Sequence, residues 1–155
     1  VGADELTYHL HIVLRFEIER ELGAGDLAVA GVPTVWNDRM DAYLGVRPDG
    51  DDEGCLQDIH WSHGSFGYFP TYSLGSVLAA QLYAAAAAEI DDLDSKIEAG
   101  EFDALQAWLR ENVHEHGRRY RTDELIERAT GEPLTAEYFL EYAESKFGEL
   151  YDLDR

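Results

Sequence analysis

The sequence has little cysteine, little lysine and no long apolar run, and each shortage excludes a class of protein. The single cysteine, Cys55, excludes an internal disulfide framework and any zinc ribbon built on paired CxxC motifs. The apolar stretch from Val77 to Ile90 is shorter than the roughly 20 residues that cross a bilayer, so it predicts a buried helix and no membrane partner. The first residues, Val1 to Leu6, lack the basic start of a signal peptide, and we expect a cytoplasmic protein.

Cationic residues are scarce beside the acidic ones. Asp and Glu number 32 against 12 Lys and Arg, which gives a formal net charge of −20, and Lys96 and Lys146 are the only lysines. This charge excludes nucleic acid and anionic membranes as expected partners, because binding to both starts from Lys and Arg contacts to phosphate. Spread-out acidic residues with almost no lysine are typical of halophilic proteins, whose self-repulsion is screened by concentrated salt. An ordinary acidic mesophilic protein is the alternative.

Apolar residues recur at helical spacing in six segments, and no segment alternates as a strand does. The first helix is expected to stop at Gly23, the second at Gly45 and the fifth at Gly131, since glycine commonly ends helices. Residues 1–155 are therefore expected to form a single all-α region. The six segments are about Asp4 to Leu22, Pro33 to Leu44, Thr71 to Ile90, about Asp103 to His114, Thr122 to Thr130, and a final helix capped by Thr135.

The segment from Gly54 to Pro70 fits neither the helical nor the strand period, and it concentrates polar and aromatic side chains. It contains Gln57, Asp58, His60, Trp61 and His63. We take it as the functional segment of the chain.

The six histidines invite a metal hypothesis, which their spacing does not support. His114 and Glu115 look like the start of an HExxH zinc motif, but Arg118 stands where the second histidine belongs. We expect His9, His11, His114 and His116 to be surface or locally bonded residues.

The run Gly54-Cys-Leu-Gln57-Asp58-Ile-His60-Trp61 resembles the GxxQDxHW motif of the carboxypeptidase Taq family at every specified position. The likeness continues from Ser65 to Gly75. Ala3-Asp4 resembles the alanine–aspartate motif of that family, and Glu132-Pro-Leu134 with Gly148-Glu-Leu-Tyr151 resembles its C-terminal helix. The resemblance covers essentially the whole chain.

The resemblance implies the helical C-terminal part of a zincin-like zinc metallopeptidase, which removes residues one at a time from peptide C-termini. In that family the HExxH pair, the catalytic glutamate and the acidic zinc ligand lie upstream of the region matched here. We therefore expect zinc or cobalt in the full-length enzyme only, and a fragment that binds no metal and is inactive alone. The expected partner is a peptide with a free C-terminus.

The resemblance also suggests roles for single residues. His60 is expected to donate a hydrogen bond to the substrate or intermediate, and Tyr72, or alternatively Tyr68, to the oxyanion. Both tyrosines could instead be core aromatics. Gln57 and Asp58 are expected to orient His60 on the substrate-binding side, with a cap or turn role as the alternative. Two further residues complete the expected substrate-binding set: Trp61, which is better explained by packing, and Asp4, which could pair with a site cation or cap a helix.

Two hypotheses of different classes remain after the sequence analysis. The first is a metallocarboxypeptidase fragment that supplies the substrate and oxyanion wall of a cleft. The second is a non-catalytic helical module that binds peptides. For the fragment we expect exposed apolar surface, for which self-association as a homodimer would be a remedy.

Overall fold

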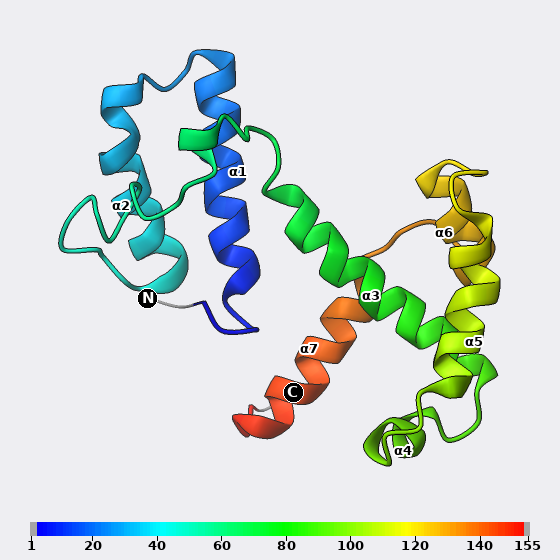
Figure 1. The fold of residues 1–155 in the computed structure, drawn as a ribbon. Coiled ribbons are helices and arrows are strands. Elements are labelled where there is room, and N and C mark those ends of the chain that lie inside the picture. The colour runs from blue at the N-terminus through cyan, green and yellow to red at the C-terminus, as the bar shows by residue number, and fades with distance from the viewer. Residues whose placement is uncertain (1–2, 154–155) are drawn as a thin grey trace. The chain divides into compact units, whose positions relative to one another are not determined.

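The computed structural model describes residues 3–153, which form helices and loops and, within that range, no β-strand (Figure 1). The all-α expectation is confirmed. The chain divides into two compact units, residues 1–74 and residues 75–155. Helix α3 (Pro70–Glu89) begins in the first unit and continues in the second.

The first unit is built on α1 (Tyr8–Ala24) and α2 (Val32–Leu44), which lie side by side (Figure 1). Leu14 and Ile18 are fully buried, one helical turn apart, and they face Trp36 and Met40 of α2 in one apolar cluster. Burying a side chain of this size contributes about 1.5–3 kcal/mol. Cys55 belongs to the same cluster, so the loop after α2 is held against the helix pair.

Glycines in the left-handed backbone region end three of the helices. Gly45 (φ 66°) and Gly131 (φ 84°) end α2 and α6 (Thr122–Thr130), as expected. The stop expected at Gly23 is wrong, because α1 continues to Ala24 and Gly25 takes the left-handed conformation (φ 79°). The N–H of Gly25 donates to the carbonyl of Leu22, which satisfies a free acceptor at the helix end.

The second unit contains the later part of α3 with α4 (Leu93–Glu98), α5 (Asp103–Asn112), α6 and α7 (Glu137–Leu150). Its core joins Ala86 of α3 to Leu93 and Trp108. Helix α4 was not predicted, since six residues are too few to show a period. Short 3-10 turns, η1 (Val29–Gly31), η2 (Trp61–His63) and η3 (His114–His116), complete the order.

Helix α3 does not have the all-round burial that its apolar sequence predicts. Only Gln81 and Ala86 are buried in this helix, and Leu74 is 50% exposed. The difference arises because the core of the second unit meets α3 mainly on the face that carries Ala86. The expected exposed apolar surface is thus present on this helix.

Gln81 is the polar centre of the second unit and is 1% exposed. Its Nε2 group donates to Thr130 Oγ1 at 3.0 Å and to the carbonyl of Pro133 at 3.1 Å. Its Oε1 atom accepts from the N–H of Thr135 at 3.0 Å. One amide side chain therefore ties the connection between α6 and α7 to α3. Thr135 Oγ1 accepts from the N–H of Glu137 at 3.3 Å, but the residue at the N-cap position of α7 is Ala136 and not the expected Thr135.

Within residues 3–153, no helix has both the length and the apolar character that crossing a membrane requires.

Candidate functional site

The loop that contains residues 54–69 packs against α1 through two buried charged side chains, Arg15 and Glu19. They are four residues apart, so they lie on one face of the helix, one turn from each other. Arg15 is 9% exposed and Glu19 is 8% exposed. Buried charges are rare unless they are paired, and both of these have partners in the loop.

Glu19 holds the loop with both carboxylate oxygens. Trp61 Nε1–H donates to Oε1 at 2.9 Å, and the backbone N–H of Gly67 donates to Oε2 at 3.0 Å. The Trp61 ring also meets Trp36 edge-on at 6.0 Å between ring centroids. Trp61 therefore packs and anchors in this unit, in agreement with the packing explanation given above.

We expect that Glu19→Gln will destabilise the first unit by about 1–3 kcal/mol, because the amide offers only one acceptor for two donors and leaves a buried N–H unpaired. Urea unfolding followed by Trp fluorescence measures the change. The matched control is Glu89→Gln in α3, where, within residues 3–153, Glu89 accepts one side-chain hydrogen bond, from Trp108 Nε1–H at 3.0 Å, so one amide oxygen suffices. Equal effects of the two substitutions would contradict this account of Glu19.

Asp58 joins Arg15 to His60. Arg15 Nε–H donates to Asp58 Oδ2 at 3.0 Å, while Oδ1 accepts from the backbone N–H of His60 at 2.9 Å and faces His60 Nδ1 at 2.5 Å. Burial alone would raise the pKa of Asp58, but the hydrogen bonds from His60 and Arg15 outweigh it and lower the pKa below the ordinary value. Asp58 is thus a carboxylate near neutral pH.

Tyr72, in the first turn of α3, meets the other side of the imidazole. Its hydroxyl lies 3.0 Å from His60 Nε2, and burial raises the pKa of the phenol above its ordinary value of 10.0. Because Asp58 is ionised, the proton of a neutral His60 is placed on Nδ1, and Nε2 then accepts from the Tyr72 hydroxyl. When His60 takes up a second proton, Nε2–H donates to the phenol oxygen and the phenol hydrogen can turn to another acceptor.

Aromatic rings surround the His60–Tyr72 pair. Tyr68, 49% exposed, stacks on His60 with centroids 5.9 Å apart and meets Tyr72 edge-on at 5.3 Å. Phe69 is 2% exposed, and its ring is tilted against the His60 ring with 4.8 Å between the ring centroids. These rings leave part of the His60 side chain, 26% by area, open to solvent.

The remaining predicted residues lie apart from this network. The side chain of Gln57 is exposed. Asp4 is also exposed, and its Oδ1 atom accepts from the backbone N–H and the hydroxyl of Thr7 at 2.7 and 2.8 Å. These bonds give Asp4 a local turn role just before α1. The structure thus brings together His60, Tyr72, Tyr68 and Asp58, whereas Gln57 and Asp4 are not brought to them.

Sequence reasoning missed Arg15 and Glu19. A signal for both was available, because charged residues at positions 15 and 19 directly follow Leu14 and Ile18, the apolar positions that repeat every four residues in this helix. A charged side chain next to the buried apolar face of a helix either lies at the solvent-exposed edge of that face or is buried with a partner of opposite charge. The sequence offers no means of choosing between these until the loop is placed.

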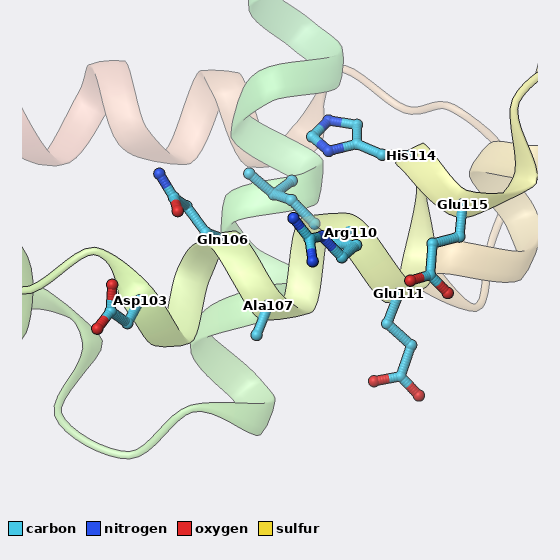
Figure 2. A pocket seen from close by; sticks show the side chains of 8 residues that line it. Asp103, Gln106, Ala107, Arg110, Glu111, His114 and Glu115 are labelled. Atoms are coloured by element: carbon cyan, nitrogen blue, oxygen red, sulfur yellow. The ribbon is translucent and has the colours of Figure 1, made fainter.

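A metal centre is not formed by the residues that the structure describes, since positions 3–153 contain no group of three His, Cys, Asp or Glu arranged to hold an ion. A hollow on the second unit runs along α5 and η3 and includes His114, Glu111 and Glu115 (Figure 2). In Figure 2 the side chains of Glu111 and His114 point in different directions, as expected for a histidine outside any metal motif. His9 is half-buried and its bond is not local, because its Nδ1 lies 2.9 Å from Ser73 Oγ, 64 positions further along the chain.

Residues 1–147 match the model of the carboxypeptidase Taq (M32) metallopeptidase family. Thermostable carboxypeptidase 1 of Pyrococcus furiosus is 46% identical over 94% of this chain and 29% of its own length. Carboxypeptidase 1 of Bacillus subtilis is 44% identical over 97% of this chain and 30% of its own length.

Solved structures show the same relationship. The M32 carboxypeptidase of Deinococcus radiodurans superimposes with a TM-score of 0.94 and 49% identity, over 98% of this chain and 31% of that protein. Metallocarboxypeptidase 1 of Trypanosoma cruzi gives a TM-score of 0.90 at 46% identity, over 94% and 31%. The chain thus spans about 30% of the length of the curated relatives that it matches. With its family model matched from residue 1 to residue 147, the chain belongs to the carboxypeptidase Taq (M32) metallopeptidase family.

Proposed function

We propose that this chain forms the substrate-binding and oxyanion-stabilising wall of a zinc-dependent metallocarboxypeptidase that releases C-terminal residues from peptides. The observation that carries the proposal is the 3.0 Å contact between His60 Nε2 and the Tyr72 hydroxyl. Asp58 Oδ1 contacts the other ring nitrogen of His60, Nδ1, and so orients the imidazole toward Tyr72. Family membership supports the reaction class.

Peptide hydrolysis converts a planar carbonyl into a tetrahedral intermediate whose oxygen gains negative charge. Hydrogen-bond donors already aimed at that oxygen lower the barrier, because they need no reorganisation as the charge develops. In this proposal His60 donates when its imidazole carries both protons, and the Tyr72 hydroxyl then turns from Nε2 to the oxyanion, with Tyr68 as the alternative phenol. The Tyr72 phenol is suited to the role because it is protonated near neutral pH, and burial raises its pKa further above the ordinary value of 10.0.

Residues 3–153 contain no group of three His, Cys, Asp or Glu placed to hold a metal ion, and no step of the proposal passes through a metal. We place the zinc, or cobalt in its stead, in the part of the full-length enzyme that this chain does not include. Gln57, Asp58, Asp4 and Trp61 are proposed to line the peptide side of the wall in the complete enzyme, where Gln57 and Asp4 offer exposed polar groups.

Two further proposals come from composition and burial. The net charge of −20 supports a salt-rich cytoplasm as the working environment. Exposed apolar side chains such as Leu140, Leu150 and Tyr151, at 53%, 66% and 58%, support self-association as a homodimer.

The test of the function is a peptide-release assay with the full-length protein, zinc and high salt. A peptide with a free C-terminus should lose residues one at a time, while the same peptide with an amidated C-terminus should stay intact. Mass spectrometry follows the products. Cleavage of both peptides at equal rates would show an endopeptidase and contradict the proposal.

The runner-up function is a non-catalytic helical module that binds peptides, favoured by the solvent-open His60 among its aromatic neighbours. Calorimetric titration of the 155-residue chain separates the two functions. Tight binding of a free-acid peptide by this chain, together with no release by the full-length protein, would favour the module.

A further inference from the structure

We infer that Arg15 is a positioning residue that fixes the tautomer and orientation of His60 by holding one oxygen of Asp58. The consequence for peptide hydrolysis rests on the proposed function, whereas the effect on His60 does not. Arg15 itself touches neither His60 nor Tyr72 through a hydrogen bond among the described contacts, so its influence passes through Asp58.

Arg15 is fixed from three directions. Its Nε–H donates to Asp58 Oδ2 at 3.0 Å, and its Nη1–H donates to the carbonyl of His11 at 2.9 Å. The guanidinium carbon also lies over the Trp36 ring at 4.6 Å and the Phe69 ring at 5.5 Å. A planar cation with two directed hydrogen bonds and two ring faces cannot rotate without losing several contacts.

The two oxygens of Asp58 have separate tasks. Because Oδ2 is occupied by Arg15, only Oδ1 faces His60, where it accepts from the backbone N–H and meets Nδ1. This division orients the carboxylate plane and places the proton of the neutral imidazole on Nδ1. Nε2 is then the atom that faces Tyr72 as an acceptor.

Loss of the guanidinium should release this arrangement. Asp58 would keep its burial, which opposes ionisation, but would lose the ion pair that favours it. The carboxylate would also be able to turn about its own axis. His60 would then populate both tautomers, and the Nε2–H form would donate to Tyr72 instead of accepting from it.

Lysine should not replace arginine here. The lysine ammonium is a compact point charge, so it can restore the charge beside Asp58 but not the second directed bond to His11 or the flat contact with two rings. Arg15→Lys therefore separates geometry from charge. Arg15→Met removes both while keeping an apolar stem of similar length.

The test is nitrogen NMR of the 155-residue chain with ¹⁵N-labelled histidine, which reports the tautomer of each ring directly. In the wild type we expect His60 to be the Nδ1–H form. In Arg15→Lys and Arg15→Met we expect a mixture of the two forms, with circular dichroism showing that the helices persist. The matched control is Arg39→Lys, since Arg39 pairs with Glu17 and Glu21 in the same unit and, among the described residues, forms no ion pair with Asp58.

A second variant keeps the inference testable if Arg15 variants unfold. Asp58→Asn retains the side-chain shape and one acceptor oxygen, and it should release the His60 tautomer while Arg15 is present. Where the Arg15 variants do fold, adding Arg15→Lys to Asp58→Asn should change the tautomer no further, because Arg15 acts through Asp58. An unchanged His60 tautomer in Asp58→Asn, or a further change in the double variant, would overturn the inference.

Kinetics of the full-length peptidase separate this inference from the proposed function. Substitution of a residue that orients a functional side chain typically lowers activity by about 10–100-fold. We expect Arg15→Lys to lower kcat by this factor, with a smaller change in KM. A tautomer shift without any loss of kcat would leave the effect on His60 standing and would count against the proposed catalytic role of His60. A constant tautomer would overturn the inference at any level of activity.

Discussion

Tyr72→Phe in the full-length peptidase proposed above should lower kcat by about 10²–10³-fold, the usual effect of removing one oxyanion donor. The ring and its edge-on contacts with Tyr68 and Tyr8 remain in the variant, so the fold should be preserved. Only the hydroxyl that meets His60 Nε2 at 3.0 Å is lost. Steady-state kinetics with a free-acid peptide measures the loss, and thermal unfolding checks the stability.

Two matched variants sharpen this experiment. Tyr68→Phe removes the alternative phenol, and a larger loss there than in Tyr72→Phe would move the oxyanion role to Tyr68. Tyr43→Phe removes a phenol that donates to Glu17 at 2.7 Å, on the same unit but outside the His60 network, and it should leave kcat unchanged. A drop in melting temperature that accounts for the lost activity of Tyr72→Phe would show a structural role instead.

Gln81→Glu should be the most destabilising single change in the second unit, by about 3 kcal/mol or more. The carboxylate can still accept from the N–H of Thr135, but it has no hydrogen to donate to the carbonyl of Pro133 or to Thr130. A charge would then be buried against a carbonyl oxygen at a position that is 1% exposed. Since whole domains are stable by only about 5–15 kcal/mol, we expect the connection between α6 and α7 to loosen first.

Urea unfolding followed by circular dichroism measures this change, and hydrogen exchange at Thr135 locates it. Gln81→Leu should cost less than Gln81→Glu, because it leaves groups unpaired but buries no charge. Gln106→Glu adds the same charge at an exposed position of α5 and should be nearly neutral. Equal stability of Gln81→Glu and Gln106→Glu would contradict the role of Gln81 as the centre of this network.

The helices could be predicted because their apolar positions and end glycines act locally. Gly45 and Gly131 end helices where expected, since a left-handed residue is a local requirement that glycine meets. The stop at Gly23 was wrong because a glycine can also be accommodated within a helix, and only the geometry at Gly25 decides between the two.

The sequence predicted some of the residues that lie together around His60, but it did not predict their geometry. A motif match located His60, Asp58 and Tyr72, yet nothing in the loop sequence shows that Asp58 divides its oxygens between Arg15 and His60. That arrangement joins residues 43 positions apart, and such contacts have no local signature. The exposure of one face of α3 could not be predicted from the apolar pattern either. That pattern shows which side chains favour burial, but it does not show whether another element covers them.

The double use of each buried carboxylate constrains how the charge of this protein can be redesigned. A variant adapted to low salt would be made by changing surface acids to their amides, and most of the 32 acidic residues are open to that change in principle. Glu19 and Asp58 are different, because each accepts hydrogen bonds on both oxygens from parts of the chain that must stay together. A library of acid-to-amide variants should therefore leave Glu19 and Asp58 unchanged. At these two positions the negative charge stabilises the fold, whereas the exposed acidic residues only interact with solvent and salt.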